Sequence, residues 1–198
     1  PMGSAGPSDL AAACVAYWTF EEAAGGPYAD STARGNTLTA TASPTQQSGI
    51  ISNAIGTTSA NYVSIADNND VGTGVGVDFT AVFWFYRTEN GTQALLSKAG
   101  ASCEYHIQLD ASNRLEMFAR SDYGVSKFGA TASINAWHQA VCWFSTSDQR
   151  IHLQMDAGTV YDSSGTVANL SRQVTLPLII GKGKTTYIDE AALFHIVL

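Results

Sequence analysis

The sequence predicts an all-β protein built from two packed antiparallel sheets. Short apolar runs recur along its 198 residues with the alternating period of half-buried strands. Turn-forming Gly, Asn, Asp and Ser residues separate these runs, and no stretch keeps the period of an amphipathic helix. Many short antiparallel strands are typical of a two-sheet sandwich. A chain of this length fits one such domain.

The predicted strands follow one another along the whole chain. The first (residues 15–20) and the last (residues 186–196) both alternate apolar with polar side chains, and we expect them to be neighbours. The polar segments Asp110–Asn113 and Ser145–Gln149 suit hairpin loops in length and composition. In chain order, the predicted strands are Val15–Phe20, Thr37–Thr41, Ser59–Ile65, Phe79–Arg87, Gln93–Lys98, Glu104–Leu109, Leu115–Arg120, His138–Phe144, Arg150–Met155, Leu178–Ile180 and Thr186–Ile196.

Alternation divides each strand into a core face and an outward face. Within residues 79–86, Thr80, Val82, Trp84 and Tyr86 fall on the outward face. The predicted core positions are Phe79, Ala81, Phe83, Phe85, Tyr105, Ile107, Leu109, Leu115, Met117, Ala119, Ala140, Cys142, Phe144, Ile151, Leu153 and Met155.

The outward positions mix aromatic rings with hydrogen-bonding side chains, which is the chemistry of a sugar-binding surface. Aromatic rings stack on the apolar faces of sugars, while amide, imidazole and carboxylate groups bind sugar hydroxyls. An outer sheet face covered by loops or by a neighbouring subunit explains the same pattern equally well. Placed on one shared face, the candidate ligand-binding residues are Tyr86, His106, Glu116, Phe118, Arg120, Trp143, His152 and Gln154.

Several short segments occur in an order that resembles a known family. The segments are Tyr17-Trp18-x-Phe20-x-Glu22, Asp30-Ser31 with Gly35-Asn36, Asn61-Tyr62-Val63-Ser64-Ile65, Asp78-Phe79-Thr80, Leu95-Leu96-Ser97-Lys98, Trp137-His138-Gln139-Ala140 and Ile188-Asp189-Glu190-Ala191. Together they resemble the laminin G-like and pentraxin-like domains of the concanavalin A-like lectin and glucanase superfamily. The resemblance implies a jelly-roll sandwich, usually extracellular and often calcium-binding, that acts in glycan or protein recognition.

Paired carboxylates stand near both chain ends, as Glu21-Glu22 and Asp189-Glu190. Adjacent carboxylates are costly unless they face water, a cation or a metal, and solvated strand ends explain them without a metal. Calcium prefers carboxylate and carbonyl oxygens. The family resemblance implies a structural Ca2+ held by Glu22, Asp30 and Asp189, with Glu21 and Glu190 as second choices.

The amino-acid composition limits the classes of partner that the protein is expected to bind. A net charge of -7 and a pI of about 4.8, with scattered basic residues, argue against nucleic acid. The longest apolar runs, such as residues 176–180, are too short to cross a bilayer, so no membrane insertion is expected. Cys142 is expected to be a buried free thiol, whereas Cys14 and Cys103 could form a disulfide.

The domain boundary is expected close to the amino end. Residues 1–10 contain no apolar stretch and are interpreted as a flexible lead or a cloning remnant. Residues 11–198 are interpreted as one laminin G-like domain.

The sequence does not favour an enzyme. Glycosidases of the common types use two carboxylates that flank the scissile bond. Laminarinase-type glucanases of this fold carry Glu-x-Asp-x-x-Glu on one strand, but residues 115–120 hold Glu116 alone. No Gly-x-Ser-x-Gly elbow is present to support a serine nucleophile.

These observations favour a non-catalytic glycan-binding or adhesion module displayed outside a cell or on a virus particle. The alternative is a structural decoration or assembly protein, for example of a phage virion, that uses the sandwich for protein contacts. A degenerate hydrolase is the third hypothesis, since one fold hosts all three functions. Either of the first two could form oligomers or larger assemblies.

Overall fold

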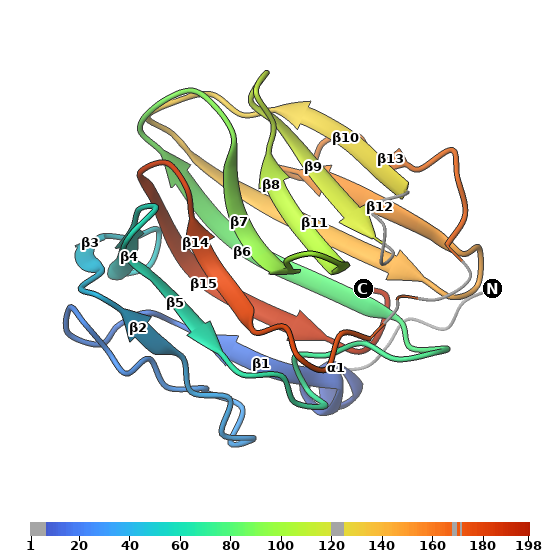
Figure 1. Ribbon diagram of the computed structural model, residues 1–198, viewed down its shortest axis with the longest axis horizontal. Helices are drawn as coiled ribbons and strands as arrows, with labels where there is room; N and C mark the ends of the chain where they lie inside the picture. Colours follow the sequence, from blue (N-terminus) through green and yellow to red (C-terminus); the bar gives the residue numbers. More distant parts are fainter. Residues whose placement is uncertain (1–6, 120–124, 168–169, 171) are drawn as a thin grey trace.

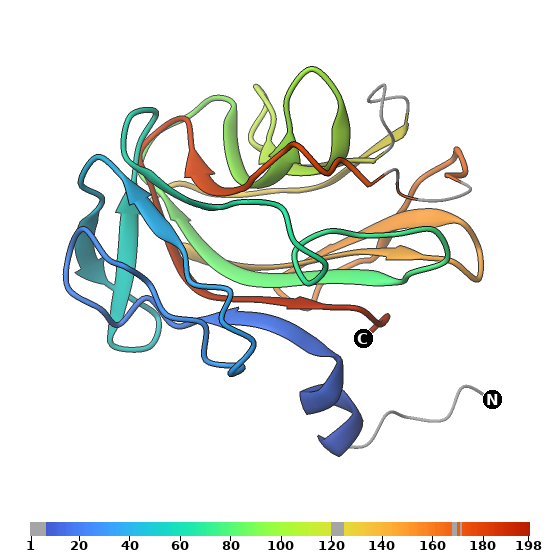
Figure 2. The ribbon, with the colours of Figure 1, turned by 60° about the horizontal axis from the view of Figure 1, so that its bottom comes forward.

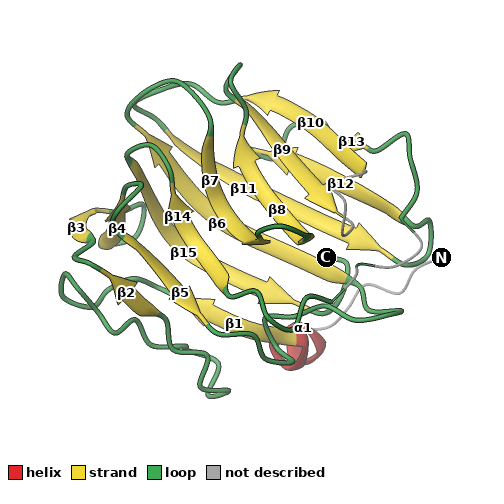
Figure 3. Cartoon of the chain, viewed as in Figure 1, coloured by secondary structure: helices red, strands yellow, loops and turns green. Residues whose placement is uncertain are grey.

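The computed structural model describes residues 7–119, 125–167, 170 and 172–198 (Figure 1). Within these residues nearly all regular structure is strand, and the one helix is α1 (Pro7–Ala13) (Figure 3). The first sheet contains β1 (Cys14–Trp18), β3 (Thr45–Ser48), β4 (Asn53–Thr57), β6 (Phe79–Arg87), β11 (Trp137–Ser145), β12 (Arg150–Met155), β13 (Tyr161–Asp162) and β15 (Thr186–Phe194). The second contains β2 (Thr39–Thr41), β5 (Tyr62–Ile65), β7 (Gln93–Ala99), β8 (Cys103–Leu109), β9 (Arg114–Ala119), β10 (Val125–Thr131) and β14 (Leu178–Lys182).

The two sheets lie face to face, as the rotated view shows (Figure 2). The eight-stranded sheet runs in the order β13-β12-β11-β6-β15-β4-β3, and β1 also pairs with β15. The seven-stranded sheet runs in the order β10-β9-β8-β7-β14-β5-β2. Every pairing between named strands is antiparallel. The all-β, two-sheet prediction is therefore confirmed.

The core lies between the sheets and is built from the positions that alternation predicts. All sixteen predicted core side chains, Phe79 to Met155, are buried in one hydrophobic cluster. Phe79 from the eight-stranded sheet stacks on Tyr105 from the seven-stranded sheet, with ring centroids 4.4 Å apart. Trp18 of β1 is fully buried in the same cluster. The sheets are therefore held by a continuous apolar layer.

The strands that the sequence did not reveal are short, polar or glycine-containing. β3 reads Thr-Gln-Gln-Ser and lies at the edge of its sheet, so it buries little apolar surface. β4 contains Gly56, and β13 has two residues. Pairing with neighbouring strands, rather than local hydrophobic alternation, makes these segments extended. At the amino-terminal end, α1 crosses the predicted domain boundary between residues 10 and 11.

The first and last strands are neighbours, as predicted. β1 pairs with β15 through Ala16 with Leu193 and Trp18 with Ala191. The main-chain N–H of His195 also donates to the carbonyl of Ala13, 3.1 Å away. Between Asp189 and Ala192 the register of β15 against β6 shifts, which marks a bulge in the strand.

A buried ionic cluster fastens two loops to the seven-stranded sheet. Lys98 Nζ lies 2.7 Å from Asp67 Oδ1, 2.8 Å from Glu104 Oε2 and 2.7 Å from the carbonyl of Gln173. Glu104 also accepts hydrogen bonds from the main chain and hydroxyl of Thr73. Lys98 and Glu104 are both fully buried. The loops that carry Asp67 and Gln173 are thereby joined to β7 and β8.

The three cysteines are free thiols, so the structure contains no bridge between Cys14 and Cys103. Cys142 is buried in the core as predicted, and burial raises the pKa of its thiol. Among the described residues no helix has the length and apolar character needed to span a bilayer.

Candidate functional site

The predicted ligand-binding residues do not share one face. Tyr86, Trp143, His152 and Gln154 belong to the eight-stranded sheet, whereas His106, Glu116 and Phe118 belong to the seven-stranded sheet. Both sets alternate with core positions along their strands. Because the two sheets lie face to face (Figure 2), the two sets are on opposite sides of the sandwich. The expectation of a single face was wrong because alternation separates inward from outward positions but does not say which sheet a strand joins. Arg120, the eighth candidate, lies outside the described residues.

On the seven-stranded sheet, the predicted polar residues bind one another. His106 Nδ1 is 2.7 Å from Ser97 Oγ, and Nε2 is 3.0 Å from Gln108 Oε1. The Gln108 amide in turn donates to Glu116 Oε2 at 2.8 Å. Burial lowers the pKa of His106 and raises that of Glu116. This chain of hydrogen bonds spans three strands and uses the polar atoms that a ligand would need.

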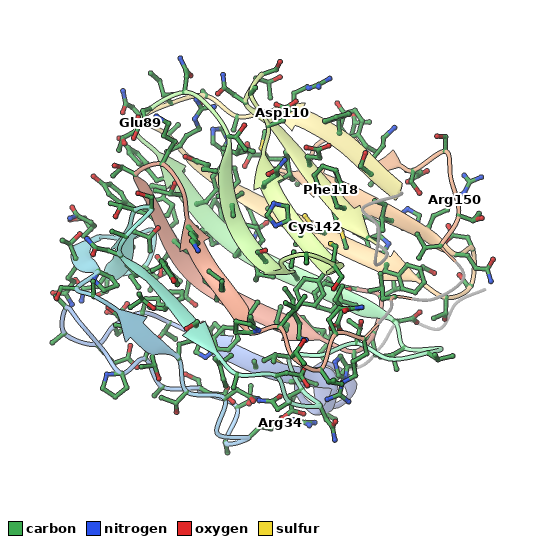
Figure 4. All side chains as sticks on the ribbon, in the orientation of Figure 1. Arg34, Glu89, Asp110, Phe118, Cys142 and Arg150 are labelled. Atoms are coloured by element: carbon green, nitrogen blue, oxygen red, sulfur yellow. The ribbon has the colours of Figure 1, made fainter. Side chains whose placement is uncertain are left out.

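Among the described residues, Asp110 is the carboxylate whose charge acts on Glu116, and it is not free for glycosidase chemistry. The charge of Asp110 contributes to the raised pKa of Glu116, after the larger effect of burial. However, Asp110 Oδ2 is held by Arg114 through Nε at 2.9 Å and Nη2 at 2.7 Å. Asp110 lies at the β8–β9 turn, away from Phe118 on the same sheet (Figure 4). It therefore serves the turn, as its hydrogen bond from the Arg114 N–H indicates.

The outward side of the eight-stranded sheet gathers aromatic residues. Three of the four tryptophans in the chain lie there, together with two tyrosines and a glutamine. All six side chains are partly exposed. We call this surface the aromatic face; its residues are Trp84, Tyr86, Trp137, Gln139, Trp143 and Tyr187.

The rings of the aromatic face follow from strand register. Tyr86 is paired with Trp137 of β11 on one side and with Tyr187 of β15 on the other. The Tyr86 and Tyr187 rings stack, 5.3 Å apart and 7° from parallel, and the Tyr86 and Trp137 rings are 5.6 Å apart. Beyond Tyr187 the register reaches Gly56, where a Cβ atom would lie 2.4 Å from Thr45 Oγ1. The adjacent strands β11, β6 and β15 therefore present one row of three rings. The next position in this row, Gly56 of β4, has no side chain.

Trp143 forms the far end of the aromatic face. Its ring stacks on His152, with centroids 4.9 Å apart and planes 11° from parallel. His152 in turn contacts Asp162 Oδ1 through Nδ1 at 2.8 Å and Asp148 Oδ2 through Nε2 at 3.2 Å. Gln154 donates to the carbonyl of Gly158 at 2.8 Å, so its amide is committed to a turn. His152 therefore acts as a support for the indole of Trp143.

The polar atoms of the aromatic face are available to a ligand. None of the described residues forms a hydrogen bond with the three indole N–H groups, the two tyrosine hydroxyls or the side-chain amide of Gln139. None of these side-chain atoms is buried. Sequence reasoning placed Trp84 on an outward face but did not select it, and it did not select Trp137, Gln139 or Tyr187. The alternation of β6, β11 and β15 places these residues at outward positions. It predicts a shared aromatic surface only once the three strands are known to be neighbours.

A serine, a histidine and an aspartate also meet at the start of β11. His138 Nδ1 is 2.6 Å from Asp156 Oδ2, and Nε2 is 3.0 Å from Ser133 Oγ. The Ser133 N–H also donates to Nε2, at 3.1 Å. The nitrogen that would take a proton from the hydroxyl is thus already bonded to the backbone. We interpret the group as a tie between the loop before β11 and the turn after β12.

The carboxylates predicted to bind calcium are bonded to nearby backbone. Asp30 Oδ1 accepts from the N–H groups of Tyr17 and Thr32 at 3.1 and 2.9 Å. Its Oδ2 accepts from the N–H of Asn36 at 3.0 Å, and the Thr32 hydroxyl reaches both oxygens. Hydrogen bonds to the charged form lower the pKa of Asp30 despite its burial. Asp30 is therefore an Asx-type loop anchor with its lone pairs in use.

In the described part of the chain, no hydrogen-bond donor reaches one buried oxygen of Glu22 and one of Asp189. Asp189 Oδ2 accepts from the N–H groups of Ile50 and Ile51 at 2.8 and 3.1 Å, but Oδ1 accepts none. Burial raises the pKa of Asp189 to about 6. Glu22 Oε1 accepts from the Ala29 N–H at 2.7 Å, and its Oε2 is likewise unpartnered.

The three carboxylates do not fit a shared calcium cluster. In the part of the chain that the structure describes, no three His, Cys, Asp or Glu side chains are grouped to hold a metal. The second choices are also engaged, since Glu21 accepts from Asn53 and Glu190 from the Tyr17 hydroxyl. Calcium at Glu22 or Asp189, completed by main-chain oxygens, stays a prediction.

The chain is similar to a known protein family over most of its length. Residues 57–198 match the laminin G family model of the concanavalin A-like lectin/glucanases superfamily. The chain belongs to this family. A search of curated protein sequences found no match. The laminin G-like assignment accounts for the two-sheet architecture and confirms the resemblance seen in the sequence segments.

Solved structures show the same fold at low sequence identity. The binding domain of Paraclostridial Mosquitocidal Protein 1 superposes with a TM-score of 0.79 at 15% identity, over 96% of this chain and 50% of that one. Domain 4 of AbnA, an extracellular GH43 arabinanase from Geobacillus stearothermophilus solved with arabinotriose, gives 0.69 at 12% identity, over 93% of each chain. The binding domain of botulinum neurotoxin DC, solved with SialylT, gives 0.71 at 9% identity over 96% and 49%. The laminin G-like chain thus spans about half the length of the toxin binding domains.

Proposed function

We propose that this laminin G-like domain is a non-catalytic glycan-binding module and that the aromatic face holds the glycan. The observation that carries the proposal is the row of rings from Trp137 through Tyr86 to Tyr187, whose polar side-chain atoms bond to none of the described residues. Sugars present apolar C–H faces and hydroxyl edges, which match rings edged by indole N–H, phenol and amide groups.

The similar structures support this proposal by what they bind. The AbnA domain was solved with arabinotriose, and cell entry of botulinum neurotoxin type C depends on interaction with two ganglioside molecules. The arabinanase that contains the AbnA domain is extracellular, and we propose the same setting, or a virion surface, for this chain. The pairing of Asp110, the acid whose charge acts on Glu116, with Arg114 supports a non-catalytic role.

The test is a glycan array followed by calorimetric titration of any ligand found. Trp137→Ala and Trp143→Ala should each weaken binding by at least about 1 kcal/mol, because each removes a stacking surface. Both side chains are partly exposed, so the free energy of unfolding should change less than it does for a core truncation. Circular dichroism of each variant checks that the fold is kept.

Phe118→Ala is the matched control, since it removes an aromatic ring from the outward side of the opposite sheet (Figure 4). Binding should persist in this variant. Loss of binding in Phe118→Ala with retention in Trp137→Ala would move the site to the seven-stranded sheet.

Protein recognition is the second candidate function. A botulinum neurotoxin DC binding domain of the same fold was solved with rat synaptotagmin II, at a TM-score of 0.70 over 96% of this chain. An array without any glycan ligand, together with self-association that Trp137→Ala abolishes, would favour a structural or assembly protein that uses the aromatic face for protein contacts.

A further inference from the structure

We propose that the ligand of the aromatic face is an uncharged oligosaccharide and that anionic glycans, such as sialylated ones, are discriminated against. This inference rests on the proposed function, because it names the substrate class of the same site. It follows from the charges on and around the face rather than from the rings themselves.

None of the six residues of the aromatic face is a Lys or Arg that could pair with an anionic sugar. Among the outward positions of the described strands β3, β4, β6, β11, β12 and β15, Arg150 is the one Lys or Arg. Arg150 lies at the far end of β12 (Figure 4), two residues before His152, and its main-chain N–H donates to Asp148 Oδ1 at 3.1 Å. The basic end of β6, Arg87, points into the core and is fully buried.

Two further basic side chains near the face, Lys184 and His152, contact carboxylates. Lys184, just before β15, lies 3.2 Å from Glu89 Oε2. His152 beneath Trp143 contacts both Asp148 and Asp162. In these contacts each basic side chain faces at least one carboxylate.

The edge of the face is acidic instead. Asp148, Asp156 and Asp162 line it, with side chains 45%, 45% and 52% exposed. Asp156 lies beside the middle of the aromatic face, where its Oδ1 accepts the Gln139 N–H at 2.8 Å. A glycan carboxylate placed on the rings would lose water, gain no cation and approach these carboxylates. An uncharged sugar carries none of these costs.

The extent of the face suits a chain of sugars. Trp137 and Trp143 are six residues apart on the single strand β11, a span of about 20 Å at the usual rise of a strand. Trp84 and Gln139 are paired between them. Rings and hydroxyl-binding groups are thus repeated along one direction, as successive sugar residues require.

The experiment compares lactose with sialyllactose, and arabino-, xylo- and gluco-oligosaccharides with acidic oligosaccharides, by calorimetry at low and high salt. Uncharged ligands should bind at least about tenfold more tightly than their acidic counterparts. Their affinity should not change with salt, since no ion pair is formed. Tighter, salt-dependent binding of the acidic ligands would overturn this inference and leave the glycan-binding function standing. Failure of every glycan to bind would overturn the function itself.

Gln139→Lys and Gln139→Glu form a matched pair that tests the charge argument directly. The lysine variant should raise the ratio of sialyllactose to lactose affinity by about fivefold, the effect of one close charge pair in water. The glutamate variant should lower that ratio. An unchanged ratio in both correctly folded variants would show that charge at the aromatic face does not select the ligand, and would overturn the inference.

Discussion

Among single residues, the tryptophans show how one side chain type serves two purposes. Trp18 is fully buried, and its indole N–H donates to the carbonyl of Asn36 at 2.7 Å. Trp84, Trp137 and Trp143 instead expose part of their rings on the outside of the eight-stranded sheet. A buried indole that finds a main-chain acceptor stabilises the fold, whereas a partly exposed indole keeps its N–H accessible to water or to a ligand.

Asp189 should make the stability of the protein depend on pH. Its pKa is raised to about 6 in the folded state, above the value of about 3.9 expected in the unfolded chain. Its favourable contribution is therefore complete below about pH 4 and is lost as pH rises through about 6. Asp189→Asn removes the ionisation, and its amide oxygen can still accept from Ile50 and Ile51.

The measurement is urea unfolding of wild type and Asp189→Asn in the presence of chelator, at about pH 4 and about pH 8. The stability of the variant relative to wild type should rise between the two values by on the order of 2 kcal/mol, since one pKa unit corresponds to about 1.4 kcal/mol. A constant difference across this range would show that Asp189 does not titrate there.

At the scale of elements, β14 and β4 approach each other so closely that one glycine is required. Gly181 has φ +73, and a Cβ atom there would lie 2.3 to 2.7 Å from three atoms of Thr57. Gly76 has the same φ, with nothing within 4 Å of its added Cβ. Alanine at Gly76 therefore meets the backbone strain alone, and alanine at Gly181 meets the strain together with a clash.

Gly181→Ala should thus destabilise the protein by about 1–3 kcal/mol more than Gly76→Ala. Denaturant midpoints of the two variants against wild type give this difference. Equal losses would indicate that β14 and β4 can separate without cost.

The loops at Asp67 and Gln173 depend on the buried Lys98 cluster. Lys98→Met leaves the buried Glu104 without its cation and should cost about 3–5 kcal/mol. Adding Glu104→Gln removes the unpaired buried charge. The double variant should therefore lose less free energy of unfolding than the sum of the losses in the two single variants. A double-mutant cycle in denaturant measures the coupling, and strict additivity would contradict it.

The sequence predicts the strands and their buried positions better than it predicts which strands pair with one another. Alternation of β6, β8, β9, β11 and β12 identified every core position that it proposed, because burial on one side of a strand is a local pattern. It could not reveal that Trp143 and Phe118 belong to different sheets, since that depends on pairing between strands far apart in the chain. The same limit hid Tyr187 as a neighbour of Tyr86, and β3, which carries no apolar signal.

For the whole molecule, calcium is the remaining prediction. Glu22 Oε2 and Asp189 Oδ1 are buried oxygens that a bound cation would satisfy, and binding to the native state alone would raise the melting temperature. Differential scanning calorimetry in calcium and in chelator measures the effect, with Asp189→Asn as the control that should abolish it. Equal melting temperatures for wild type in both conditions would exclude a stabilising calcium ion.

The pairing of β1 and β4 with β15 also sets an order of events during synthesis. Both strands are made long before β15, yet β1 pairs with residues 191–194, and β4, besides its hairpin with β3, pairs with residues 186–188. β6 can pair with β11 sooner, but its other edge stays open until β15 emerges. Such long-range closure slows folding and leaves strand edges exposed in the nascent chain. Completion of the eight-stranded sheet, and with it the Tyr86–Tyr187 stack, therefore waits for the last strand to be made.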